Sequence, residues 1–497
     1  MLYFRLMKVW KKILPFLVII GAALLLLYVP DVGPEKYTDL STYFQTERGR
    51  QSYTGFAVVV IRDGGVYYVN AFGADGSGKP LSADTPFCLG AVSESITGLA
   101  TLCLEKDGRI GLDTPVKDYL PDFGFAPQKQ NGDGSTVTLR HLLTHTSGVS
   151  GLDFDDYHPE AADLKASVRV LKSAKPRAKP GVEEHYIDTG YQTVGLILEK
   201  QSGEDFAGLI ERLVFKPLAM EKSSAGADKV AGALPMGASS FFGIALPRRQ
   251  VLDSAAAPSN YIVSTPRDMG SYLSFLLAPQ KTKKRPIPVR FVPALFERLE
   301  KNSGYAYGWR VSGSGKELSA DHLGPLGSSS AAVSLWPAQA SGVAILAPQN
   351  SLLQSLIAMP ALISGTREII SKGSTSRPFP LGRLYILLAV VAVVHILALA
   401  LQTGGALSWA KDVKGRAEAS DGRGPIVWAL VSSWLGIAVR LLIGIFTPLV
   451  LSAIFGRRVS WAMAFALEPG IASWALAAIS FGMLRNLARL AWLHGPR

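Results

Sequence analysis

The sequence predicts an α+β fold: an antiparallel sheet flanked by helices, an all-helical part beside it, and a bundle of membrane-spanning helices after both. Within residues 31–377, strand-like stretches alternate with helix-like stretches, and long apolar runs follow this region. The composition agrees, since 48% of the 497 residues are hydrophobic and only 18% are charged, against about 25% charged in ordinary soluble domains. These values exclude a disordered chain, a small disulfide scaffold and a purely soluble protein of usual composition.

The strands are indicated at both ends of residues 31–377. Asp63-Gly64-Gly65 separates two apolar stretches and is typical of a hairpin turn. The expected strands are residues 55–61, 66–72, 305–311, 331–336 and 342–347.

Two longer segments have helical periodicity. Residues 91–106 are apolar-periodic and are closed by Asp107-Gly108, and residues 186–203 show the same pattern. Terminal strands with helices between them favour one antiparallel sheet in an α+β arrangement.

Four apolar runs are long enough to concern a membrane. Residues 13–29 follow four cations, and we expect an uncleaved signal anchor within residues 1–30, with a cleaved signal peptide as the alternative. The other three runs belong to residues 378–497 and each approaches the roughly 20 residues that cross a bilayer as a helix. They are residues 384–402, 426–455 and 461–484, with a cytoplasmic loop at 403–425.

The cations predict the topology. Residues 1–30 carry four basic and no acidic residues, and the loop at 403–425 is basic as well, so both are expected in the cytoplasm. Residues 31–377 then form an extracytoplasmic domain of a multi-pass protein in the plasma or inner membrane. Arg457 and Arg458 fall in the predicted outer turn, against this trend. Because most of the net charge of +12 flanks the membrane segments, no nucleic-acid partner is expected.

Several stretches together resemble one known family. Residues 85–100 read TPFCLGAVSESITGLA, residues 141–148 read HLLTHTSG, residues 186–191 read YIDTGY, residues 216–220 read KPLAM, and residues 322–324 read HLG. In this order they resemble the serine β-lactamase and penicillin-binding-protein superfamily, in its class C-like branch. The three C-terminal runs are similar to those of membrane-bound peptidases that remove a prodrug group from natural products.

The resemblance implies a site in which a serine begins a helix and a lysine follows one turn later. A Tyr-x-Asn element, a Lys/His-x-Gly strand and two backbone N–H groups that bind the oxyanion complete it. At the serine and lysine positions this chain holds Ala91 and Glu94. Ser93 and Ser95 are the nearest hydroxyls, and neither is followed by a lysine three residues later.

The other walls of the implied site match the family pattern at some positions and differ from it at others. Tyr186, His322 and Gly324 match the family, whereas Asp188 stands at the asparagine position. Pro325 stands where a backbone N–H is needed, and proline has none. We therefore expect that acyl transfer is lost. The altered pocket, here called the relict site, comprises Ala91, Ser93, Glu94, Tyr186, Asp188, His322 and Gly324.

The resemblance places Glu94 and Asp188 side by side, and three outcomes are open. They share a proton with one pKa raised, they turn toward water, or a cation bridges them with His322 as third ligand. The first is favoured, and no metal or other cofactor is expected, since no paired-histidine spacing is present. His145 is expected to be a structural hydrogen-bond donor.

The favoured function is a membrane-anchored binding or scaffolding pseudoenzyme of the cell envelope, with a peptide, a cell-wall fragment or a protein in the relict site. An active peptidase, esterase or β-lactamase-like hydrolase with a non-standard constellation is the alternative. A third hypothesis is a structural partner of an active homologue, in a homo- or hetero-oligomer joined through the membrane helices.

Overall fold

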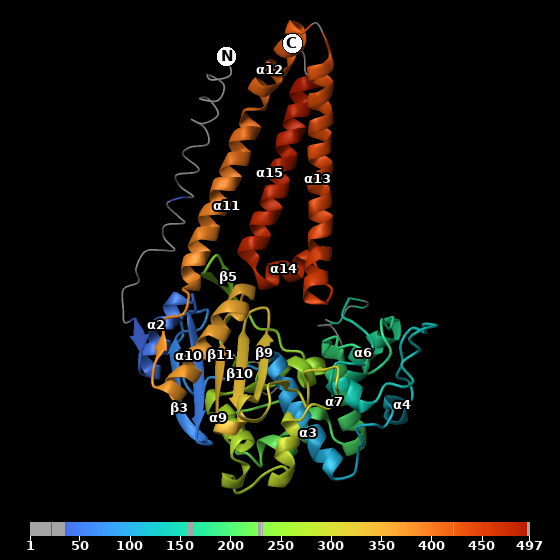
Figure 1. Cartoon of the computed structure of the whole chain (residues 1–497), viewed down its shortest axis with the longest axis vertical. Coiled ribbons are helices and arrows are strands. Elements are labelled where there is room, and N and C mark those ends of the chain that lie inside the picture. Colours follow the sequence, from blue (N-terminus) through green and yellow to red (C-terminus); the bar gives the residue numbers. More distant parts are fainter. Residues whose placement is uncertain are drawn as a thin grey trace.

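The computed structural model describes Gly21 and residues 35–494, without 153, 155, 157–162, 227–229, 231 and 421. The predicted N-terminal anchor at 13–29 therefore lies outside the described residues, apart from Gly21. Figure 1 shows a globular part below and three long helices that rise from it, with the C-terminus at their far end.

The globular part is built around a six-stranded sheet in the order β3-β2-β11-β10-β9-β8. Every neighbouring pair is antiparallel, as the sequence predicts. The strands are β2 (Gly55–Arg62), β3 (Gly65–Gly73), β8 (Arg310–Ser312), β9 (Ser319–Pro325), β10 (Ser330–Trp336) and β11 (Ser341–Ala347).

Strand β2, which lies next to the edge strand β3, is buried on both faces, and its side chains alternate between two cores. Val59 and Ile61 belong to the core on the side of α3 (Ser93–Lys106) and α9 (Pro266–Leu277). Val58 and Val60 belong to the core under α2 (Leu40–Arg50) and α10 (Met359–Lys372). Helices thus cover both faces of the sheet, which makes the α+β arrangement a three-layer one.

Five of the described helices form an all-helical part beside α3 (Figure 1) and share its hydrophobic core. They are α4 (Val116–Tyr119), α5 (Leu139–Leu143), α6 (Leu164–Val168), α7 (Asp188–Ser202) and α8 (Phe206–Ile210). Three small antiparallel pairs complete the globular part: β1 (Lys36–Tyr37) with β12 (Thr375–Ser376), β4 (Phe87–Cys88) with β7 (Val263–Ser264), and β5 (Gly237–Phe241) with β6 (Ile244–Arg248).

The predicted strand at 305–311 is wrong in its first part, because only Arg310–Ser312 is a strand. Residues 305–309 form a loop in which Gly308 has a φ of 76°. A Cβ atom there would lie 2.1 Å from the carbonyl oxygen of Glu94. The loop is therefore pressed against the first turn of α3, and this contact replaces strand pairing.

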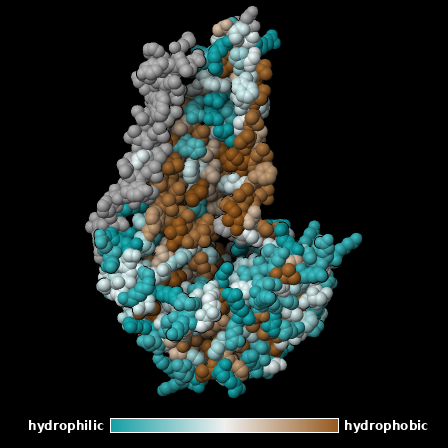
Figure 2. All heavy atoms as spheres, viewed as in Figure 1, coloured by the Kyte–Doolittle hydropathy of each residue, from teal (hydrophilic) through white to brown (hydrophobic). Residues whose placement is uncertain are grey.

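Among the described residues, three helices are long and apolar enough to span a bilayer: α11 (Leu381–Gly404), α13 (Gly424–Phe455) and α15 (Pro469–His494). Figure 2 shows their surface as mainly hydrophobic, above a globular part that is mainly hydrophilic. Between α11 and α13, the predicted loop contains α12 (Ala406–Ala419).

The third helix differs from the predicted run at 461–484. A short helix, α14 (Trp461–Leu467), precedes it, and the chain bends at Glu468, whose φ and ψ are −149° and 72°. A residue before proline is pushed out of the helical region, so Pro469 separates α14 from α15. Figure 1 shows α14 lying across the base of the helical bundle.

Close packing joins α13 to α15 through two glycines. A Cβ on Gly482 would lie 1.8 Å from Nε of Arg440, and one on Gly436 would lie 2.4 Å from the Asn486 amide. Arg440 donates a hydrogen bond to the carbonyl of Gly436 at 2.8 Å. Small residues at these positions let polar side chains cross the interface, a recurring way for membrane helices to associate.

Candidate functional site

The relict site begins at the turn that leads into α3. Gly90–Val92 form one turn of 3₁₀-helix, and Gly90 has a φ of 53°. A Cβ on Gly90 would lie 2.3 Å from the carbonyl oxygen of Gly324, and one on Gly324 would lie 2.7 Å from the nitrogen of Ala91. The backbones of β9 and the turn therefore touch, which requires glycine on both sides. Ala91, at the serine position of the family, is only 7% exposed.

The two neighbouring hydroxyls serve the backbone. Ser93 accepts a hydrogen bond from the N–H of Ile262 at 3.1 Å, and Ser95 donates to the carbonyl of Val92 at 2.7 Å. Both serines are fully buried. Their contacts are those of structural groups that hold the start of the helix.

Glu94 lies at the centre of the relict site and is fully buried. The Tyr186 hydroxyl donates to its Oε1 at 2.8 Å, and Nε2 of His322 lies 3.2 Å from its Oε2. Nε2 of His145 lies 3.4 Å from the same oxygen. Burial by itself raises the pKa of Glu94, but the charge and hydrogen bond of His145, followed by those of His322, outweigh it and lower the pKa.

His145 was expected to be a structural donor, and the structure places it inside the site. Its backbone is left-handed, with a φ of 54°, and its ring centroid lies 4.4 Å from that of Tyr186 and 4.6 Å from that of Tyr305. The N–H of Ile187 points at its Nδ1 at 3.4 Å. In the neutral ring the proton is therefore assigned to Nε2, the atom that faces Glu94.

Asp188 begins α7 and has different neighbours. The Tyr186 hydroxyl lies 3.3 Å from its Oδ1, and Nη2 of Arg457 lies 3.4 Å from its Oδ2. The backbone N–H of Asp188 donates at 2.8 Å to Asp156, which also accepts from the N–H of Thr189 at 3.0 Å and from its hydroxyl at 2.6 Å. Burial and the nearby charge of Asp188 raise the pKa of Asp156 to about 6.

The favoured expectation for the two carboxylates is therefore wrong for Glu94, whose pKa is lowered. The Tyr186 hydroxyl stands between Glu94 and Asp188, and each carboxylate has its own cationic or imidazole neighbour. Within the part of the chain that the structure describes, no cluster of three or more histidine, cysteine, aspartate or glutamate side chains has the arrangement of a metal site. Cys88 and Cys103 are free and buried.

The remaining wall of the site is the end of β9. His322 pairs with Val333, Gly324 with Ala331, and Pro325 with Ser330 at the last position of the strand. Pro325 supplies no N–H there. The sequence motifs thus bring Ala91, Glu94, Tyr186, Asp188 and His322 together. His145 belongs to one of these motifs, but its contact with Glu94 was not predicted. Asp156 and Arg457 were missed, and only Arg457 had a signal, as part of an arginine pair in the predicted outer turn.

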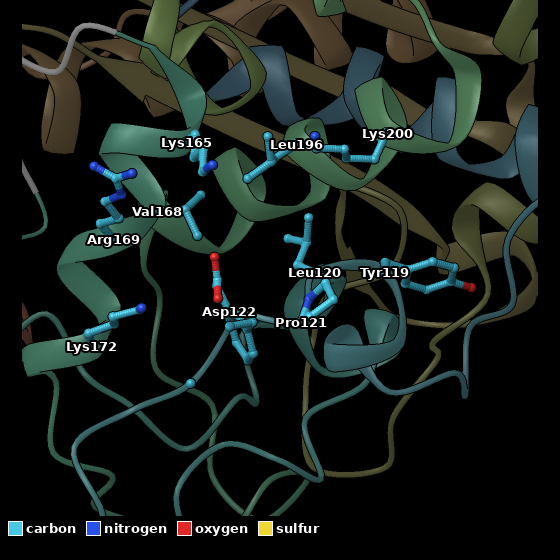
Figure 3. A pocket seen from close by; sticks show the side chains of 12 residues that line it. Tyr119, Leu120, Pro121, Asp122, Lys165, Val168, Arg169, Lys172, Leu196 and Lys200 are labelled. Atoms are coloured by element: carbon cyan, nitrogen blue, oxygen red, sulfur yellow. The ribbon is translucent and has the colours of Figure 1, made fainter.

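A pocket also opens away from the relict site, in the all-helical part (Figure 3). Apolar side chains form its floor and four cations stand around its rim, together with Asp122. The floor includes Leu120, Val168 and Leu196, and the cations are Lys165, Arg169, Lys172 and Lys200.

Comparison with known proteins shows the same relationship. The family model described as Beta-lactamase matches residues 40–365. Esterase EstB of Burkholderia gladioli is 32% identical over 201 residues, which cover 36% of this chain and 49% of the esterase. Protein flp of Staphylococcus aureus is 24% identical over 337 residues, which cover 63% of each chain. The chain thus spans about half to two thirds of the length of these relatives.

A similar fold is present in the octameric penicillin-binding protein homologue from Pyrococcus abyssi. The two structures superpose with a TM-score of 0.53 at 23% identity, over 62% of this chain and 72% of that chain. The D-alanine carboxypeptidase AmpC from Burkholderia cenocepacia gives 0.52 at 20% identity, over 65% of this chain and 96% of the other. At this level of sequence identity, the two comparisons show a similar fold.

Proposed function

Because the chain belongs to the Beta-lactamase family, we propose that it is a membrane-anchored member that has lost serine acyl transfer and acts as a binding or scaffolding pseudoenzyme. One observation carries the proposal: at the start of the helix, the position that holds the nucleophilic serine in this family is occupied by Ala91, whose side chain is a methyl group. The next catalytic position holds Glu94, a buried anion surrounded by Tyr186, His145 and His322.

The chemistry of acylation explains why these two changes matter together. A serine hydroxyl attacks a carbonyl only when a neighbouring base takes its proton, and Ala91 has no hydroxyl. Ser93 accepts a hydrogen bond from a backbone N–H, and Ser95 donates to a backbone carbonyl and accepts from the Tyr272 hydroxyl. Glu94 is a carboxylate of lowered pKa held by histidine and tyrosine donors, so it is a weak base. Pro325 also removes one of the two N–H groups that stabilise an oxyanion in the family.

The experiment is covalent labelling of the full-length protein in detergent, with a fluorescent penicillin and a fluorophosphonate, read by intact mass spectrometry. We expect no adduct. The matched control is Ala91→Ser, which restores the hydroxyl but not the lysine and should stay unlabelled as well. A penicilloyl or phosphonyl adduct on the unmodified chain would overturn the proposal.

The alternative, an active hydrolase of non-standard constellation, is favoured by one contact. Nε2 of His322 and Oε2 of Glu94 lie 3.2 Å apart, and together they form a carboxylate–imidazole pair. Such a pair can activate water. Hydrolysis of p-nitrophenyl acetate that disappears in His322→Phe would support this alternative, whereas equal background rates in both proteins would exclude it for that ester.

We also propose that residues 31–377 face the extracytoplasmic side of the plasma or inner membrane and that the C-terminus is cytoplasmic. The three apolar helices and the basic residues between α11 and α13 support this orientation. Reporter fusions after His494 should be active only with a cytoplasmic reporter. This placement indicates that the ligand of the domain is an envelope component. It also indicates that any oligomer formed through the membrane helices joins the chain to another membrane protein.

A further inference from the structure

The turn between two membrane helices reaches the relict site. Gly456–Ser460 connect α13 to α14, and Figure 1 shows this end of the bundle against the globular part. Three hydrogen bonds join the turn to the loop 150–152: Ser150 Oγ donates to the carbonyl of Gly456 at 3.2 Å, and Arg458 donates from its N–H to Gly151 at 2.9 Å and from Nε to Leu152 at 3.0 Å. The turn is therefore docked on the domain through two of its backbone groups and the Arg458 side chain.

The approach is close because the loop has a glycine at its centre. A Cβ on Gly151 would lie 3.1 Å from the Cβ of Arg457. Side chains at these two positions would be in direct contact. Gly151 thus allows the turn to lie against the loop that precedes Asp156.

Arg457 is the residue of the turn that enters the site. Its Nη2 lies 3.4 Å from Oδ2 of Asp188, and its side chain is only 27% exposed. Asp156, bonded to the first residues of α7, is part of the same electrostatic group. The carboxylates of Asp156 and Asp188 repel each other near the start of α7, and a cation close to Asp188 offsets that cost.

The contacts continue from Arg457 to the centre of the relict site. Asp188 lies 3.3 Å from the Tyr186 hydroxyl, and that hydroxyl lies 2.8 Å from Glu94. The guanidinium of Arg457 is therefore connected to Glu94 through two side chains, Asp188 and Tyr186. The aspartate at an asparagine position, which the family pattern leaves unexplained, has a cation as its partner here.

We propose that the relict site binds the guanidinium of Arg457, so that the chain's own membrane turn is its occupant and blocks access to Ala91. This inference rests on the proposed loss of acyl transfer. The ligand class of the site is then a guanidinium supplied in cis, and any other ligand must displace it. The orientation of the α13–α14 turn thereby controls whether the pocket is open.

The first arm of the test measures proximity. Gly151→Cys combined with Arg457→Cys in full-length protein in membranes should form a disulfide, because bridged Cβ atoms are about 3.8 Å apart. The two native thiols are buried, and burial raises their pKa to about 12, so they should not compete. Absence of the cross-link under mild oxidation would overturn the proposal.

The second arm measures access to the pocket through an Ala91→Cys reporter and a membrane-impermeant maleimide. Adding Arg457→Ala should raise the labelling rate about tenfold, equivalent to about 1.4 kcal/mol of opening. Asp188→Asn should act in the same way while keeping the side-chain shape. Arg457→Lys should restore slow labelling.

The matched control is Arg458→Ala on the same reporter, since Arg458 belongs to the same turn but donates to a backbone carbonyl. It should leave the rate within about twofold of the reporter alone. Equal rates for Arg457→Ala and Arg458→Ala would show that the turn only anchors the domain, which refutes occlusion. Acylation of the unmodified chain would refute the proposed function alone, because cross-linking and labelling do not depend on it.

Discussion

Replacing Glu94 by glutamine removes one negative charge from the middle of the relict site and keeps the size of the side chain. The carboxylate has three neighbours that can donate: the Tyr186 hydroxyl at 2.8 Å, Nε2 of His322 at 3.2 Å and Nε2 of His145 at 3.4 Å. Glutamine offers one oxygen in place of two. Its amide N–H₂ would face at least one imidazole N–H, because Nδ1 of His145 is turned to the N–H of Ile187.

The loss of stability follows from the number of donors. A hydrogen bond to a charged acceptor contributes about 1.5–3 kcal/mol and a neutral one about 0.5–1.5 kcal/mol, so each donor loses about 1 kcal/mol. Tyr186 and His322 make the two hydrogen bonds to Glu94, so Glu94→Gln should cost about 2 kcal/mol at neutral pH. In a domain of this size, whose entropy of unfolding is about 0.7 kcal/mol/K, that lowers the Tm by roughly 3 °C.

Thermal melts in detergent, followed by tryptophan fluorescence, measure this difference. The matched control is Glu105→Gln on the same helix, where the partly exposed carboxylate accepts from the Tyr307 hydroxyl at 2.6 Å and from Lys106 Nζ at 3.3 Å. Its cost should be about 1 kcal/mol.

The pH dependence has a definite sign. Because the pKa of Glu94 is lowered in the folded protein, its stabilisation is complete above the ordinary value of 4.5 and is lost as the pH falls through the folded value. The difference in the free energy of unfolding between wild type and Glu94→Gln should therefore become smaller only at acidic pH. If Glu94→Gln is as stable as wild type or more stable at neutral pH, the hydrogen-bond network around an ionised Glu94 is refuted. The result would then favour the hypothesis that Glu94 and Asp188 share a proton.

Two further predictions concern packing. Ser93→Ala should cost about 1–3 kcal/mol, because the N–H of Ile262 loses its acceptor inside the core, and melts should show the loss while the labelling assays stay negative. Gly482→Ala should destabilise the helical bundle by about 1–3 kcal/mol, because its Cβ would meet Arg440. Gly444→Ala, whose nearest neighbour would lie 3.8 Å away, is its control, and equal melts for the two variants would contradict the packing argument.

Local patterns were sufficient for much of the fold. The hairpin between β2 and β3 follows from Asp63 and Gly64, both of which adopt a positive φ, as a tight turn of this kind demands. The three apolar runs predict α11 and α13 closely. The third run failed at its start because hydropathy does not register the bend that Pro469 imposes on Glu468.

Long-range contacts account for what could not be predicted. The loop at 305–309 is not a strand because Gly308 packs on Glu94, a contact far apart in sequence. In the site, the family motifs located Glu94, Tyr186 and His322. The roles of Asp156 and Arg457 depend on chain segments 32 and 269 residues away from Asp188, and no local pattern joins them.

The two departures that placed acids in the relict site have different physical explanations. Glu94 is stabilised as an anion from within the domain, by His145 and His322, whereas Asp188 is stabilised from the membrane helices, by Arg457. A single shared proton would leave only one negative charge to face both histidines and the arginine. A bridging metal ion would add positive charge to a site that already has these cationic and imidazole groups. The acids therefore belong to two adjoining networks that meet at the Tyr186 hydroxyl. A change in the position of the membrane turn should then alter the contacts of Asp188 directly and those of Glu94 only through Tyr186.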